Sequence, residues 1–79
     1  MMTKDQRYHF LVDNAVDSMS EQLIEDFHLP VPEALNFIYQ SSTLKIIQDS
    51  RTLLYTESPD YLYLILKYEY QNGKLPETV

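Results

Sequence analysis

Two polar side chains near the N-terminus have the spacing of a catalytic pair. His9 and Asp13 lie four residues apart, so on a helix the carboxylate would be placed to orient the imidazole as a general base. Such a base needs a group to activate, and no serine or threonine of this chain lies in a recognisable nucleophile motif. We therefore interpret the pair as a surface hydrogen bond and expect a protein that is not an enzyme.

The sequence lacks the residues that several other common sites require. It contains no cysteine, which excludes disulfides and thiolate zinc sites. Its single glycine, Gly73, cannot form a glycine-rich phosphate loop. We expect no catalytic residue, no cofactor and no metal site.

Four acidic residues recur at a spacing of four and would form an acidic ridge along one helix: Asp13, Asp17, Glu21 and Glu25. No lysine or arginine occurs between Arg7 and Lys45 to neutralise them. A solvated face that keeps the protein soluble is the common meaning of such a run. The functional alternative is a docking face for a basic protein, or mimicry of nucleic-acid charge.

Tyrosines crowd the last third of the chain, at Tyr55, Tyr61, Tyr63, Tyr68 and Tyr70. A tyrosine side chain joins a large apolar ring to a polar tip, so it suits half-buried positions and interfaces equally well. The tyrosines therefore either line a small core or contact a partner, and both interpretations stay open.

The length and charge of the chain limit its class and its partners. With 79 residues it forms one small domain whose core is near the lower limit for stability, so oligomerisation or partner binding is the expected support. The net charge of −6, with few scattered bases, argues against binding nucleic acid. No apolar run is long enough for a membrane span or a signal peptide, which predicts a cytoplasmic protein with no membrane association.

Apolar residues recur every three or four positions from Thr3 to His28, which predicts one long helix capped by Thr3. The apolar positions are Tyr8, Leu11, Val12, Ala15, Val16, Met19, Leu23 and Phe27. The segment from Ser18 to Glu21 also matches a capping box, so a kink near Ser18 is a second interpretation.

Prolines and serines divide the middle of the chain into two short helices. Pro30 ends the first helix, and Pro32 suits the first turn of a second. The serines and threonine at 41–43 interrupt that helix and cap a third, from Leu44 to about Asp49. Residues 50–57 fit either a helical turn or a loop that places Leu53 and Leu54 in the core.

The segment 59–72 begins like a strand, yet its ends are those of a helix. Ser58 is a strong N-cap, Pro59 fits the first helical position and Gly73 fits the C-terminal cap. We expect one buried face with Tyr61, Leu62, Ile65, Leu66 and either Tyr68 or Glu69. Tyr63 and Tyr70 would then lie on another face, so the helix would be apolar most of the way round and either central in the fold or turned towards a partner.

These elements predict an all-α fold, a compact bundle of three to four helices within the single domain 1–79. The long first helix packs on the last, the two short helices close the core, and residues 75–79 form a flexible tail. Read as helix–turn–helix, the segment from Leu35 to Gln48 would point Lys45, Gln48 and Arg51 outward. A small DNA-binding regulator using the helices around 33–50 is thus the alternative function, although the spacing is loose and the chain acidic.

Residues 32–69 resemble a group of small uncharacterised bacterial proteins with a domain of unknown function. Their pattern is an alanine-leucine helix, a serine-rich break, a leucine-tyrosine pair, a Glu-Ser cap and a tyrosine-rich helix that ends in Glu. The matching residues are Ala34, Leu35, Tyr39, Ser41, Leu54, Tyr55, Glu57, Ser58, Tyr61, Tyr63, Leu66 and Glu69. The resemblance implies a helical bacterial protein with a partner encoded nearby, since some members look like antitoxin-type companions.

Together these features predict a non-enzymatic protein-interaction module, the neutralising or regulatory member of a bacterial protein pair. We also expect a homodimer through the tyrosine-rich helix, because symmetric dimers bury surplus surface efficiently. The candidate interface residues are Phe10, Asp13, Asp17, Glu21, Glu25, Tyr55, Tyr63 and Tyr70.

Overall fold

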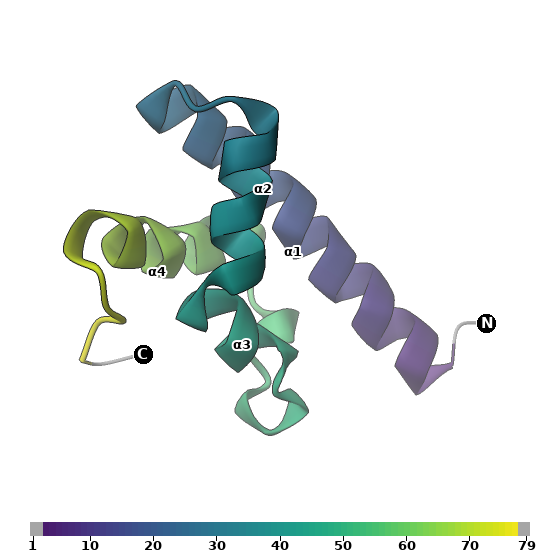
Figure 1. Cartoon of the computed structure of the whole chain (residues 1–79). Helices are drawn as coiled ribbons and strands as arrows, with labels where there is room; N and C mark the ends of the chain where they lie inside the picture. Colours follow the sequence, from purple (N-terminus) through teal and green to yellow (C-terminus); the bar gives the residue numbers. More distant parts are fainter. Residues whose placement is uncertain (1–2, 78–79) are drawn as a thin grey trace.

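The computed structural model describes residues 3–77. These residues form four α-helices and two single turns of 3₁₀ helix: α1 Lys4–Phe27, α2 Val31–Gln40, α3 Ser42–Gln48, η1 Ser50–Thr52, η2 Leu54–Thr56 and α4 Pro59–Asn72. The shorter helices lie on one side of α1, which is the longest helix (Figure 1). The predicted all-α bundle is confirmed, and α1 packs on α4 as expected.

α1 is one continuous helix, as the apolar spacing predicts, and the alternative of a break near Ser18 is not present. Thr3 and Gln6 form a capping box in which Thr3 Oγ1 accepts the Gln6 N–H at 3.1 Å and Gln6 Oε1 accepts the Thr3 N–H at 3.0 Å. Ser18, the candidate cap, lies inside α1, and its hydroxyl oxygen accepts the Gln22 side-chain N–H at 3.4 Å. The uninterrupted apolar face outweighs the local capping signal.

Ser41 alone separates α2 from α3 and caps both helices. Its hydroxyl donates to the Ile38 carbonyl at 2.6 Å and accepts the Leu44 N–H at 3.1 Å. Because Ser41 is the cap, α3 begins at Ser42, two residues before the predicted start. Pro32 lies in the first turn of α2, as predicted.

α4 crosses over this corner and holds it with a carboxylate. Glu69 accepts the backbone N–H of Ser42 at 3.0 Å, the N–H of Thr43 at 2.8 Å and the hydroxyl of Thr43 at 2.7 Å. The Thr43 side chain is fully buried. We call this arrangement the Glu69 clamp, and it ties the C-terminal half of α4 to the start of α3.

The predicted ends of α4 are confirmed. Ser58 Oγ accepts the Tyr61 N–H at 3.3 Å, and Pro59 is the first helical residue. Gly73 has a φ of 76° and donates its N–H to the Glu69 carbonyl at 2.7 Å. This left-handed C-cap is the conformation that glycine adopts without strain.

The segment between α3 and α4 corrects one prediction about the core. Leu54 is half-buried against the core, but Leu53 is 58% exposed. Leu53 takes a left-handed conformation with a φ of 57° at the junction of η1 and η2. Two successive tight turns reverse the chain there, so adjacent leucines point in different directions.

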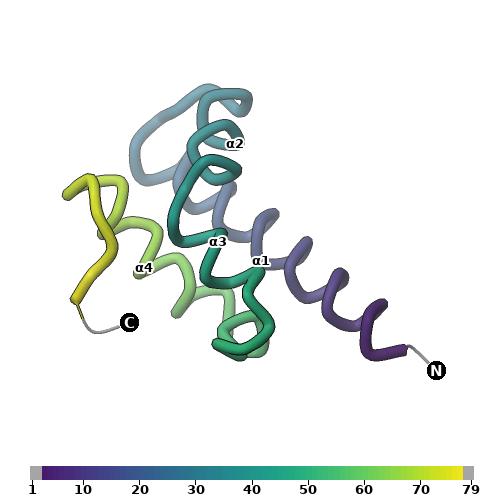
Figure 2. The backbone as a smooth tube through the Cα atoms, turned by 60° about the horizontal axis from the view of Figure 1, so that its bottom comes forward, coloured from purple at the N-terminus to yellow at the C-terminus, as the bar shows by residue number. Residues whose placement is uncertain are grey.

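One hydrophobic core joins all four helices: Val12, Ala15, Val16, Met19, Leu23, Ala34, Ile38, Leu44, Ile47, Leu62, Tyr63 and Leu66. Leu75 and Pro76 are half-buried and line a shallow hollow with Ile46 and Leu54. Figure 2 shows the chain turning back after α4. This part of the predicted tail thus lies against the domain, whereas 78–79 are outside the described residues.

Within residues 3–77, no helix combines the length and the apolar composition that crossing a bilayer needs.

Candidate interaction surfaces

The outer face of α1 carries the acidic ridge defined above, and all four of its side chains are exposed. They lie opposite the buried residues of the helix, as their spacing predicts. The ion pairs described in residues 3–77 join Asp49 to Arg51 and Asp26 to Lys67. Within that range no ridge carboxylate forms an ion pair with a lysine or arginine.

Phe10 extends the same face towards the N-terminus. It lies three residues before Asp13, so it falls on the line of the ridge, and it is 58% exposed. The outer face of α1 therefore combines an exposed aromatic ring with a row of carboxylates. We call Phe10 and the four ridge residues the α1 face.

A polar seam joins α1 to α4 at a partly exposed edge of their contact. Tyr63 donates its hydroxyl to Asp26 Oδ2 at 2.6 Å, and Lys67 Nζ lies 3.5 Å from the same oxygen. The Tyr63 hydrogen bond, together with the nearby Lys67 charge, lowers the pKa of Asp26. Burial, with a smaller contribution from the hydrogen bond to Asp26, raises the pKa of Tyr63.

The seam predicts an alkaline loss of stability that depends on Tyr63. The pKa of Tyr63 is raised above the ordinary 10.0. The stability that its protonated hydroxyl contributes is therefore fully present below that pH and is lost as the pH rises through the folded-state pKa. We expect Tyr63→Phe to lower the free energy of unfolding by about 1 kcal/mol at neutral pH. The variant should also lose less stability than wild type between about pH 8 and pH 11. Urea unfolding at both pH values measures this.

The exposed Tyr39→Phe is the matched control and should keep the wild-type dependence on pH, because its ring is 63% exposed. An equal alkaline loss in Tyr63→Phe and wild type would contradict the assignment.

Tyr63 and Tyr70 lie in the packing between helices and do not form an outer face of α4. Tyr63 is only 4% exposed, and Tyr70 packs between Phe27 and Phe37 with ring centroids 4.5 and 5.0 Å away. Both rings are therefore part of the packing between helices and present little surface to a partner. Tyr55 is also half-buried, with its ring edge-on to Tyr8 at 5.0 Å.

The outer face of α4 carries different residues. Tyr61, Leu64 and Tyr68 are 42%, 64% and 38% exposed. Their spacing of three and four places them in one stripe opposite the buried Leu62 and Leu66. We call these three residues the α4 stripe. Leu64 is not among the interface residues predicted from the sequence, although its spacing of three and four from Tyr61 and Tyr68 indicates it.

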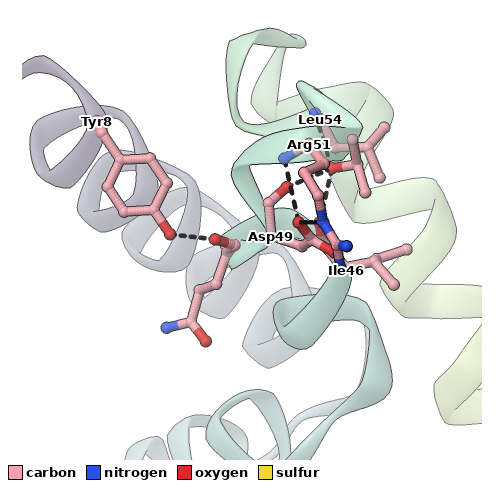
Figure 3. A network of polar contacts seen from close by, with 7 residues as sticks. Tyr8, Ile46, Asp49, Arg51 and Leu54 are labelled. Atoms are coloured by element: carbon pink, nitrogen blue, oxygen red, sulfur yellow. Dashed lines mark hydrogen bonds and ion pairs between the residues drawn. The ribbon is translucent and has the colours of Figure 1, made fainter. Parts of the chain in front are cut away.

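The loop after α3 is held by a compact polar network (Figure 3). Arg51 donates to both carboxylate oxygens of Asp49, at 3.0 and 2.8 Å, and these hydrogen bonds lower the pKa of Asp49 to about 2. Thr52 Oγ1 lies 2.7 Å from the Ile46 carbonyl and accepts the Leu54 N–H at 3.2 Å. The Tyr8 hydroxyl donates to the carbonyl of Gln48, so α1 also holds this loop.

The helix pair considered for DNA binding is α2 and α3. Lys45, Gln48 and Arg51 are all exposed, as predicted, and the Arg51 guanidinium is paired with Asp49. A single residue, Ser41, connects the two helices, whereas a helix–turn–helix motif uses a turn of about three to four residues. This corner therefore departs from the geometry of that motif.

The His9–Asp13 pair is exposed at both positions. The interactions described for residues 3–77 include no hydrogen bond between the two side chains, and the His9 ring lies edge-on to Tyr8 at 5.3 Å.

Comparisons of the sequence and structure with protein-family models, curated proteins and solved structures found no match.

Proposed function

We propose that this chain is a non-enzymatic protein-interaction module, the neutralising or regulatory member of a bacterial protein pair, and that its α1 face docks a basic partner. The observation that supports this most is the α1 face itself. Four exposed carboxylates stand in one row beside an exposed phenylalanine, and within residues 3–77 none of them forms an ion pair with a lysine or arginine. A row of like charges weakens a helix by a few tenths of a kcal/mol per pair, and a basic partner would offset that cost.

Charge and apolar contact would have separate roles in the complex. Complementary charges speed association and select the partner, whereas a desolvated aromatic ring slows dissociation. Phe10, at one end of the row, is the apolar anchor of the proposed interface.

Charge reversal on α1 tests the proposal. Tagged wild-type protein and the variant Asp17→Lys/Glu21→Lys are used to capture partners from a bacterial lysate, and bound proteins are identified by mass spectrometry. We expect a basic protein that wild type retains and the variant loses, with binding that weakens as salt rises. The variant should remain folded by circular dichroism, because both positions are exposed.

The control variant Glu33→Lys/Glu77→Lys changes the net charge equally at exposed positions outside the α1 face. It should retain the basic partner. Identical sets of bound proteins from wild type and the α1 variant would contradict the proposal.

A further inference from the structure

Because of the α4 stripe, α4 is apolar on two faces. Its inner face supplies Leu62 and Leu66 to the core, and its outer face exposes Tyr61, Leu64 and Tyr68. Side chains at this spacing of three and four form the seam along which two helices pack. The stripe is thus a helix-packing surface that the rest of the described chain does not cover.

Charged residues beside the stripe indicate the occupant. Asp60 and Lys67 are seven residues apart, so they flank the same side of the stripe near its two ends. On that side Lys67 also contacts Asp26 of α1 at 3.5 Å, and Asp60 accepts from the Gln22 side-chain amide at 3.5 Å. The Lys67 side chain remains 39% exposed, so it can also contact a partner helix. In an antiparallel pair of helices, a residue that flanks the seam on one side faces a residue at the same flanking position of the partner helix. Because the partner runs in the opposite direction, the first flanking residue of one helix meets the last flanking residue of the other. A second α4 centred on Leu64 would therefore set Asp60 against Lys67 of the other copy, and Lys67 against its Asp60.

We propose that the α4 stripe binds a second copy of this chain, with the two α4 helices antiparallel about a twofold axis at Leu64. The axis sets Tyr61 against Tyr68 of the other copy and forms two ion pairs, both between Asp60 and Lys67. A parallel pair would instead set Asp60 and Lys67 against positions 65 and 72, where the chain has isoleucine and asparagine. Charge complementarity therefore selects the antiparallel arrangement.

The dimer is compatible with partner docking because the two surfaces belong to different helices. The α1 face and the α4 stripe lie opposite the buried sides of two helices that pack on each other. Each dimer would then present two free acidic faces. A contact built on three large side chains is small, so self-association should require high protein concentration.

Sedimentation velocity over a concentration series tests the proposal on purified protein without any partner. Wild type should sediment as a dimer at high micromolar concentration, and Leu64→Glu should sediment as a monomer with an unchanged circular dichroism spectrum, because Leu64 is 64% exposed. A monomeric wild type at that concentration would overturn the proposal and leave the stripe to a different protein.

Charge variants test the orientation. Asp60→Lys and Lys67→Asp each place two like-charge contacts in the homodimer, so each dissociation constant should rise about tenfold. Mixing the two variants should restore association, because the mixed dimer again has an opposite pair at both contacts. A mixture that associates no better than either variant alone would overturn the antiparallel arrangement.

Discussion

Leu62→Ala should leave the protein largely unfolded, whereas Leu64→Ala, two residues further along the same helix, should leave it folded. Leu62 is fully buried in the core, and Leu64 is 64% exposed. Truncating a buried leucine costs about 2–5 kcal/mol, because apolar contact is lost and a cavity remains. A core in a chain this short rarely supplies more than about 3–5 kcal/mol in total, so this single loss is comparable to the whole stability.

Circular dichroism with urea unfolding at low micromolar concentration measures both variants, since self-association through the α4 stripe should be negligible there. Leu64→Ala serves as the control for changes in helix propensity, because both substitutions introduce the same residue into α4. Equal destabilisation by the two variants would mean that α4 is rotated relative to the structure described here.

The sequence predicts the ends of the helices well because the signals are local. Thr3, Ser58 and Gly73 each act within one helical turn, and each adopts the predicted capping role. The phase of α1 is also predictable, since its apolar residues occupy only one face. A boundary that depends on near neighbours can be read from the chain.

The rotation of α4 is not predictable in this way. The helix carries large side chains on several faces, so the pattern fits more than one buried face. The predicted buried face is wrong for Tyr61, which is 42% exposed. Contacts with distant segments decide the phase: Tyr63 bonds to Asp26, 37 residues away, and Glu69 to Thr43, 26 residues away. The α4 stripe becomes visible only after those contacts are known.

The direction of Leu53 has a similar cause. A pair of adjacent leucines indicates that at least one is buried, but not which one. The left-handed backbone of Leu53 follows from the two tight turns around it and from the hydrogen bonds of Thr52. The contacts that hold the loop therefore direct Leu53 towards solvent and Leu54 towards the core.

Breaking the Glu69 clamp should produce the second large effect. Glu69→Ala removes the acceptor of three hydrogen bonds at the start of α3. Two of the donors belong to Thr43, whose side chain is fully buried, so water cannot easily replace the carboxylate. We expect a loss of about 2–4 kcal/mol in the free energy of unfolding, measured by urea unfolding, and faster hydrogen exchange at the Thr43 amide.

Isosteric and nearby variants separate the clamp from general damage to α4. Glu69→Gln keeps one oxygen that can accept from Thr43 but turns an amide N–H₂ towards the Ser42 N–H, so its loss should be smaller than that of Glu69→Ala. Gln71→Ala, at an exposed position two residues further along α4, should stay within about 0.5 kcal/mol of wild type. If Glu69→Ala unfolds at the wild-type urea concentration, then Ser41 alone caps α3 and the clamp contributes nothing.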